Sequence, residues 1–269
     1  MSSPSATLAV WGSSWLNGHS APDDVIDALH QWAPLHFITV GERVTHAPAM
    51  DSWAEESDGS AMHLLRLLRH VCGTTSAISV VLPAPGDARG LPPGTAFSAA
   101  AFSEGEAVIL HSDTESMGLV PSAEGDEGLS WCIFPLEQAA PLVQPHPLGE
   151  AEYLLRTATR DAAAALGTLE FTDLAGPGDV RPLIVEALAD LSTFRYPDSI
   201  PPRAARVFDS ANEIDAILRV ADDHSPLGSL TATGATARED VLRPLRTAVR
   251  EARLAAIYAC ADAGRRRGI

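Results

Sequence analysis

The sequence contains no lysine, so all 19 basic side chains among its 269 residues are arginines. This absence excludes several classes of chemistry. A Schiff base to pyridoxal phosphate or to a carbonyl substrate needs a lysine amine. A P-loop or a kinase-type site needs the lysine that reaches the nucleotide phosphates. Enzymes of these types are therefore excluded.

Long apolar runs and paired cysteines are also missing. No run approaches the ~20 apolar residues that span a bilayer. The N-terminus has no basic region, and its apolar stretch is too short for a signal peptide. The three cysteines, Cys72, Cys132 and Cys260, are odd in number and far apart. We expect reduced, mostly buried thiols in a cytoplasmic protein that does not engage membranes.

Catalytic and metal-binding motifs are absent as well. The sequence has no Gly-x-Ser-x-Gly, Gly-x-Gly-x-x-Gly, His-Glu-x-x-His or Cys-x-x-Cys motif. His63 and His70 share one predicted helix, but seven residues separate them by about 10.5 Å along the helix axis. That distance is too long for both to bind one ion unaided. We predict no metal site and no cofactor, and the catalytic residues stay unknown.

The charge of the chain is acidic and uneven. Its net charge of −16 repels nucleic acid and anionic membrane surfaces. Residues 1–146 hold 17 acids and 4 arginines, whereas residues 147–269 hold 18 acids and 15 arginines. Arginines exceed acids only towards the C-terminus, with 8 against 4 in residues 236–269. This asymmetry indicates two parts of different character.

The first part, residues 1–140, is predicted to be an α+β domain with an antiparallel meander sheet and flanking helices. Apolar residues at 3–4 spacing predict a helix that ends near Gly18, although a strand over residues 6–11 is the alternative. Turn clusters that contain glycine join consecutive strand-like segments, as in antiparallel hairpins. The other predicted elements are helices at 22–34 and 60–72, a polar loop at 41–59, and strands at 35–40, 76–82, 95–102, 106–112, 117–121 and 129–134.

The second part, residues 147–269, is predicted to be an all-helical domain of about four helices. The proline-rich segment 135–147 resembles a linker, and strand signals disappear after it. Pro244 is expected to kink or split the last helix. The predicted helices cover residues 148–166, 179–194, 202–223 and 235–264.

The loop at residues 82–94 is the most distinctive candidate for a ligand site. It follows an apolar strand and holds four prolines, three glycines and one acid–base pair. Rigid prolines beside permissive glycines can fix backbone amides and an arginine in place, which suits the capture of a carboxylate or phosphate. The alternative is an ordered connection in which the acid caps a turn. The candidate residues are Gly86, Asp87, Arg89 and Gly90.

The last predicted helix combines arginines with an apolar stripe. Its stripe is suited to packing and contains Val241, Leu245, Val249, Leu254, Ile257 and Ala261. We expect this helix to dock on the acidic first domain or on a second copy of the chain. Nucleic-acid binding by its arginines is the weaker alternative, since such binders concentrate a dominant basic face.

Together these features favour a cytoplasmic, acidic interaction or adaptor protein that binds a protein partner or itself. The alternative function is a small-molecule-binding protein, or an enzyme that acts on an anionic ligand at the 82–94 loop. The sequence favours the non-enzymatic interpretation, because no catalytic signature replaces those that are missing.

Overall fold

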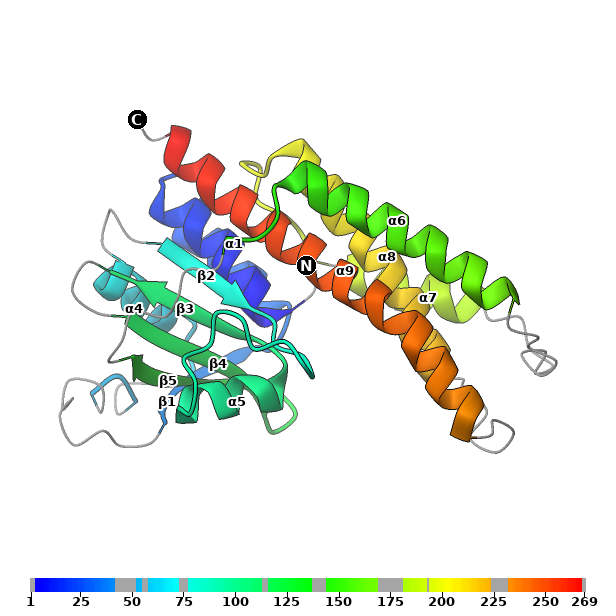
Figure 1. The fold of residues 1–269 in the computed structure, drawn as a ribbon. Helices are drawn as coiled ribbons and strands as arrows, with labels where there is room; N and C mark the ends of the chain where they lie inside the picture. The colour runs from blue at the N-terminus through cyan, green and yellow to red at the C-terminus, as the bar shows by residue number, and fades with distance from the viewer. Residues whose placement is uncertain are drawn as a thin grey trace. The chain divides into compact units, whose positions relative to one another are not determined.

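The computed structural model describes residues 3–41, 52–54, 58–72, 77–112, 116–136, 144–168, 181–192, 194–223 and 232–267. Most of the predicted loop at 41–59 and of the predicted linker at 135–147 lies outside these residues. The chain divides into two compact units (Figure 1). The first contains residues 1–144, 195–201 and 257–269, and the second contains residues 145–194 and 202–256.

The first unit is built on a five-stranded sheet in the order β1-β5-β4-β3-β2. Its four strands from β2 to β5 are antiparallel neighbours, which confirms the predicted meander. The remaining strand, β1, lies parallel to β5 at one edge, and a long stretch of chain separates the two, as parallel pairing requires. The strands are β1 (Leu35–Val40), β2 (Ala77–Val81), β3 (Ala107–His111), β4 (Ser116–Glu124) and β5 (Gly128–Leu136).

Helices α1 (Pro4–Leu16) and α4 (Met62–Cys72) cover one face of this sheet, while α2 (Pro22–His30) packs against α1. The predicted alternative of a strand over residues 6–11 is wrong. Ser3 caps α1, because its Oγ accepts a hydrogen bond from the Ala6 amide at 3.3 Å. Gly12 allows α1 to approach α4 closely, since a Cβ there would lie 2.8 Å from a Leu68 methyl and 3.4 Å from Ile78.

The segment predicted as a strand at 95–102 is instead a helix, α5 (Ala96–Glu104). Thr95 caps its start by accepting a hydrogen bond from the Ser98 amide, and Gly105 ends it in the left-handed conformation. Its many alanines are also strong helix formers. α5 covers the second face of the sheet through a core cluster that includes Val81, Leu91, Phe97, Ile109, Val120 and Phe134.

A buried histidine joins α2, β1 and β5. The Nε2 of His36 donates a hydrogen bond to the Leu29 carbonyl at 3.2 Å, and its Nδ1 accepts one from the Trp131 indole at 3.0 Å. Both partners require a neutral ring with the proton on Nε2. Burial disfavours the charged form and lowers the pKa of His36 from 6.5 to about 4.

This arrangement predicts a loss of stability in acid. Below pH 6.5 the unfolded chain takes up a proton at His36, whereas the folded chain does not until about pH 4. The free energy of unfolding should therefore fall by about 3 kcal/mol between pH 7 and pH 4 from this residue alone. His36→Gln, which keeps a donor and an acceptor, should remove that part of the pH dependence in urea unfolding. The exposed control His70→Gln should leave it in place; equal slopes for wild type and His36→Gln would contradict this.

Where the structure describes the second unit, it contains four helical segments, as predicted: α6 (Leu148–Thr168), α7 (Arg181–Ser192), α8 (Pro202–Asp223) and most of α9 (Ala232–Arg267). α8 packs against both α6 and α7. The last helix is not split at Pro244, because α9 is one helix of 36 residues. The other expected outcome, a kink at Pro244, stays a prediction. Over the described residues, no helix combines the length and the apolar character that a membrane span needs.

Candidate functional site

The 82–94 loop begins with a tight turn. Ala84 and Asp87 exchange two backbone hydrogen bonds, of 3.0 Å and 2.8 Å. Between them, Pro85 is followed by Gly86, whose φ of +83° is the value that a type II turn requires of its third residue. Gly90 has a φ of +84° and allows the next reversal. The glycines therefore set the path of the loop.

The Arg89 side chain turns back onto Asp87, two residues earlier. Its Nε and Nη2 donate to the two carboxylate oxygens at 2.8 Å and 2.7 Å, and the Arg89 amide donates to the same carboxylate at 3.2 Å. Beyond this pair, Leu91 is buried in the core beneath α5. The arrangement has the features of an ordered connection with Asp87 capping a turn. Anion binding by Arg89 remains a prediction, and an anion there would have to share the guanidinium with Asp87.

The backbone, more than the ion pair, should hold this loop in place. Gly86→Ala puts a side chain on a left-handed residue, which costs about 1–2 kcal/mol. Arg89→Ala removes an exposed pair, which contributes at most about 1 kcal/mol. Chemical denaturation of the two variants should therefore show the larger loss for Gly86→Ala. A larger loss for Arg89→Ala would mean that the guanidinium organises the loop.

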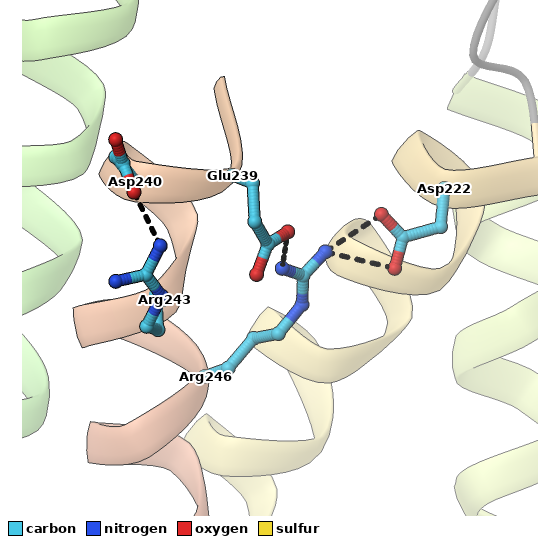
Figure 2. A network of polar contacts seen from close by, with 5 residues as sticks. All are labelled: Asp222, Glu239, Asp240, Arg243 and Arg246. Carbon is cyan, nitrogen blue, oxygen red and sulfur yellow. Dashed lines mark hydrogen bonds and ion pairs between the residues drawn. The ribbon is translucent and has the colours of Figure 1, made fainter. Parts of the chain in front are cut away.

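Arginines of α9 pair with acids of the same helical unit (Figure 2). The Arg246 guanidinium contacts the carboxylate of Asp222 at 2.7 Å and that of Glu239 at 2.5 Å. Asp222 lies at the C-terminal end of α8, where a negative charge opposes the helix dipole, so Arg246 offsets an unfavourable position. Deeper in the unit, Arg253 donates to Asn212 at 3.1 Å and to Asp215 at 3.0 Å. The expectation that these arginines face acids of the first domain is wrong for Arg246 and Arg253.

The apolar side of α9 is rotated slightly from the predicted stripe. Four residues of the stripe are buried as predicted, namely Leu245, Val249, Ile257 and Ala261, whereas Val241 and Leu254 are only half-buried. Leu242, Ala252 and Ala256 are buried in addition. Part of this buried side consists of small alanines, which the spacing of large apolar side chains does not indicate.

Packing should dominate the attachment of α9. Leu245→Ala removes a buried side chain and should cost about 2 kcal/mol or more. Arg246→Ala breaks pairs that water partly screens and should cost about 1 kcal/mol. Urea unfolding in low and high salt separates the two effects, since only the Arg246 contribution should shrink in salt. Equal, small losses from both variants would mean that α9 is not packed.

The helix α7 leaves much of its apolar surface uncovered. Among the α7 side chains whose exposure is described, only Leu191 is buried. Val185 is 66% exposed, and Pro182 and Ala189 are exposed with it. These three residues follow the i, i+3, i+7 spacing of one helix face. The neighbouring helices of the unit also expose large apolar side chains, namely Tyr153 (64%) on α6 and Ile217 (45%) on α8.

A serine–histidine pair lies on the α5 side of the sheet. Ser79 on β2 and His111 on β3 are diagonal neighbours, because Ser79 stands opposite Ile109 and His111 opposite Ala77. The Ser79 Oγ lies 2.7 Å from the His111 Nε2. Both side chains are half-buried, and burial lowers the pKa of His111. This pair is a hydroxyl next to a neutral imidazole.

The sequence alone does not reveal this pair. The two residues are 32 positions apart, and the strand that was predicted at 95–102 would have separated their strands. The usable signal was the cap of α5: Thr95 at its start and Gly105 at its end. With that segment assigned to a helix, β2 and β3 become candidates for direct pairing.

The thiols are all free, and Cys72 is buried while Cys132 and Cys260 are half-buried. Burial raises the pKa of Cys72 and of Cys260 to about 12. Neither thiol is ionised at neutral pH, and the thiolate is the reactive form.

Comparison with known proteins assigns both parts of the chain to one family. The model described as Rv1486c-like protein, N-terminal domain, matches residues 5–147, and that of the C-terminal domain matches residues 149–254. The uncharacterized protein Rv1486c of Mycobacterium tuberculosis is 38% identical over 281 residues, covering 95% of this chain and 96% of its own length. The uncharacterized protein ML1804 of Mycobacterium leprae is 36% identical over 288 residues, with the same coverage. No solved structure matches.

Proposed function

The chain belongs to the Rv1486c-like protein family, and we propose that it acts as an interaction protein whose helical unit binds a partner protein through α7. The observation that carries the proposal is the exposed apolar face of this helix. This face presents Val185, which is 66% exposed, between the smaller Pro182 and Ala189. Exposed apolar residues at helical spacing are typical of interaction surfaces.

The energetics of α7 support this role. A helix of 12 residues is marginal by itself and is normally stabilised by the packing of its apolar face. Here α7 packs on α8, yet Val185 and its exposed neighbours contribute little to that packing. Burying a side chain of the size of valine contributes roughly 1.5 kcal/mol or more. A partner that covers this face would therefore gain affinity and stabilise α7.

The spacing of the exposed residues and the charge of the chain support one kind of partner. Pro182, Val185 and Ala189 present the i, i+3, i+7 pattern that packs against another helix. The exposed Glu186 borders this face, and residues 147–269 carry 18 acids against 15 arginines. A helix with an apolar stripe and basic flanks is complementary in both shape and charge. A second copy would bring the same negative charge, and nucleic acid would be repelled.

The alternative function, capture of an anionic small molecule at Arg89, has weaker support. Asp87 already accepts two hydrogen bonds from that guanidinium. An incoming anion would have to displace this carboxylate or share the arginine with it.

The test replaces Val185 with a photo-crosslinking amino acid in the intact protein inside its native cell. The same replacement at Ala164, an exposed position on α6, is the matched control. Crosslinks should form at position 185 and not at 164, and mass spectrometry identifies the protein captured. That protein is then purified and titrated against wild type, Val185→Asp and Ala164→Asp.

Val185→Asp should weaken binding at least about tenfold, because it places a charge in an apolar interface. Ala164→Asp adds the same charge elsewhere and should change affinity less than about twofold. Equal affinities for all three proteins would contradict the proposal. Crosslinking of the chain to a second copy of itself would show that α7 is a homo-oligomer interface and would reject the separate basic partner.

A further inference from the structure

The Ser79–His111 pair lies beside the core and is partly exposed to solvent. A hydrogen bond with only a structural role does not require this position. β2 is an edge strand of the sheet, so none of the described strands lies beside Ser79 on the side away from β3. Along the same face, the core beneath α5 includes Val81 and Ile109 but neither Ser79 nor His111. The pair therefore lies next to the packed core and keeps part of its surface in contact with solvent.

We propose that Ser79 is a nucleophile and His111 its general base, forming a site for acyl transfer from small esters. The geometry required of such a pair is a hydrogen bond of 2.6–3.2 Å between the hydroxyl oxygen and a neutral imidazole nitrogen. The separation of 2.7 Å between Ser79 Oγ and His111 Nε2 meets it. With its proton on Nδ1, the His111 ring accepts the Ser79 hydroxyl proton at Nε2.

The reaction balances with ester and water as the only reactants. Ser79 Oγ attacks the ester carbonyl carbon while His111 Nε2 takes the hydroxyl proton. The bond between the carbonyl carbon and the alcohol oxygen then breaks, and His111 returns the proton to the leaving alcohol. Water then attacks the acyl carbon bound to Ser79 while His111 Nε2 takes a proton from it. The bond between that carbon and Ser79 Oγ breaks, His111 passes the proton to Ser79 Oγ, and the carboxylic acid leaves.

A second hydroxyl on the same sheet face supplies the control. Ser130 on β5 lies 3.0 Å from the Thr39 hydroxyl on β1, and no imidazole of the described residues is hydrogen-bonded to it. A serine that is merely hydrogen-bonded should behave like Ser130. A serine that is activated by a base should react with probes that do not react with ordinary hydroxyls.

The experiment treats the full chain with a fluorophosphonate, which phosphonylates activated serines with loss of fluoride. Intact mass gives the rate of labelling, and peptide mapping gives its position. Wild type should acquire one adduct, on Ser79. Its rate should rise with pH and level off with a midpoint below pH 6.5, because burial lowers the pKa of His111. A structural hydrogen bond would produce no such profile.

His111→Gln keeps a hydrogen-bonding partner for Ser79 but removes the base, and labelling should slow at least about 100-fold. Ser130→Ala should label like wild type. Absence of an adduct on Ser79 in wild type, or an unchanged rate in folded His111→Gln, would overturn the proposal. Mapping the adduct in wild type keeps the test valid even if a variant does not fold. The labelling of Ser79 does not depend on α7. The experiment on partner binding and the experiment on Ser79 reactivity can therefore contradict one proposal without contradicting the other.

Discussion

The packing of α5 on the sheet is the constraint on which the rest of the first unit depends. The chain leaves β2, crosses one face of the sheet as α5 and returns as β3, so that β2 and β3 become antiparallel neighbours. Phe97 anchors this crossing over Gly118, where a Cβ would lie 2.4 Å from its ring. A glycine is therefore needed in β4 at this point. Both the core beneath α5 and the Ser79–His111 pair follow from this arrangement.

The helical unit contains one helix that is firmly packed, α9, and one that is partly exposed, α7. α9 is attached by a buried side of leucine, valine and alanine, and the Arg246 and Arg253 contacts tie it to α8. α7, in contrast, fully buries only Leu191 among its described side chains and leaves Val185 66% exposed. A helix that is incompletely buried in the free protein is the natural place for a partner to bind. The proposed interaction thus belongs to one unit, and the proposed chemistry belongs to the other.

Much of the fold could be predicted from the sequence, because its signals are local. The leucines of α4 recur at helical spacing, and Asp23 and Asp24 suit the start of α2. The segment at 95–102 was misassigned because a short apolar run does not distinguish a helix from a buried strand. The parallel pairing of β1 with β5 joins distant segments and leaves no local signal. Arg89 and Asp87, two residues apart, were recognised as a candidate site, but their pairing with each other needed the folded loop.

Measuring the register between β2 and β3 tests this account most directly. In a nuclear Overhauser spectrum of the intact protein, Ser79 should give cross-strand contacts to Ile109, and residues 96–104 should give the i to i+3 contacts of a helix. That result would support the α5 crossing, the core beneath it and the approach of Ser79 to His111 together. Strand-type contacts over residues 96–104, with β2 paired to that segment, would contradict the account.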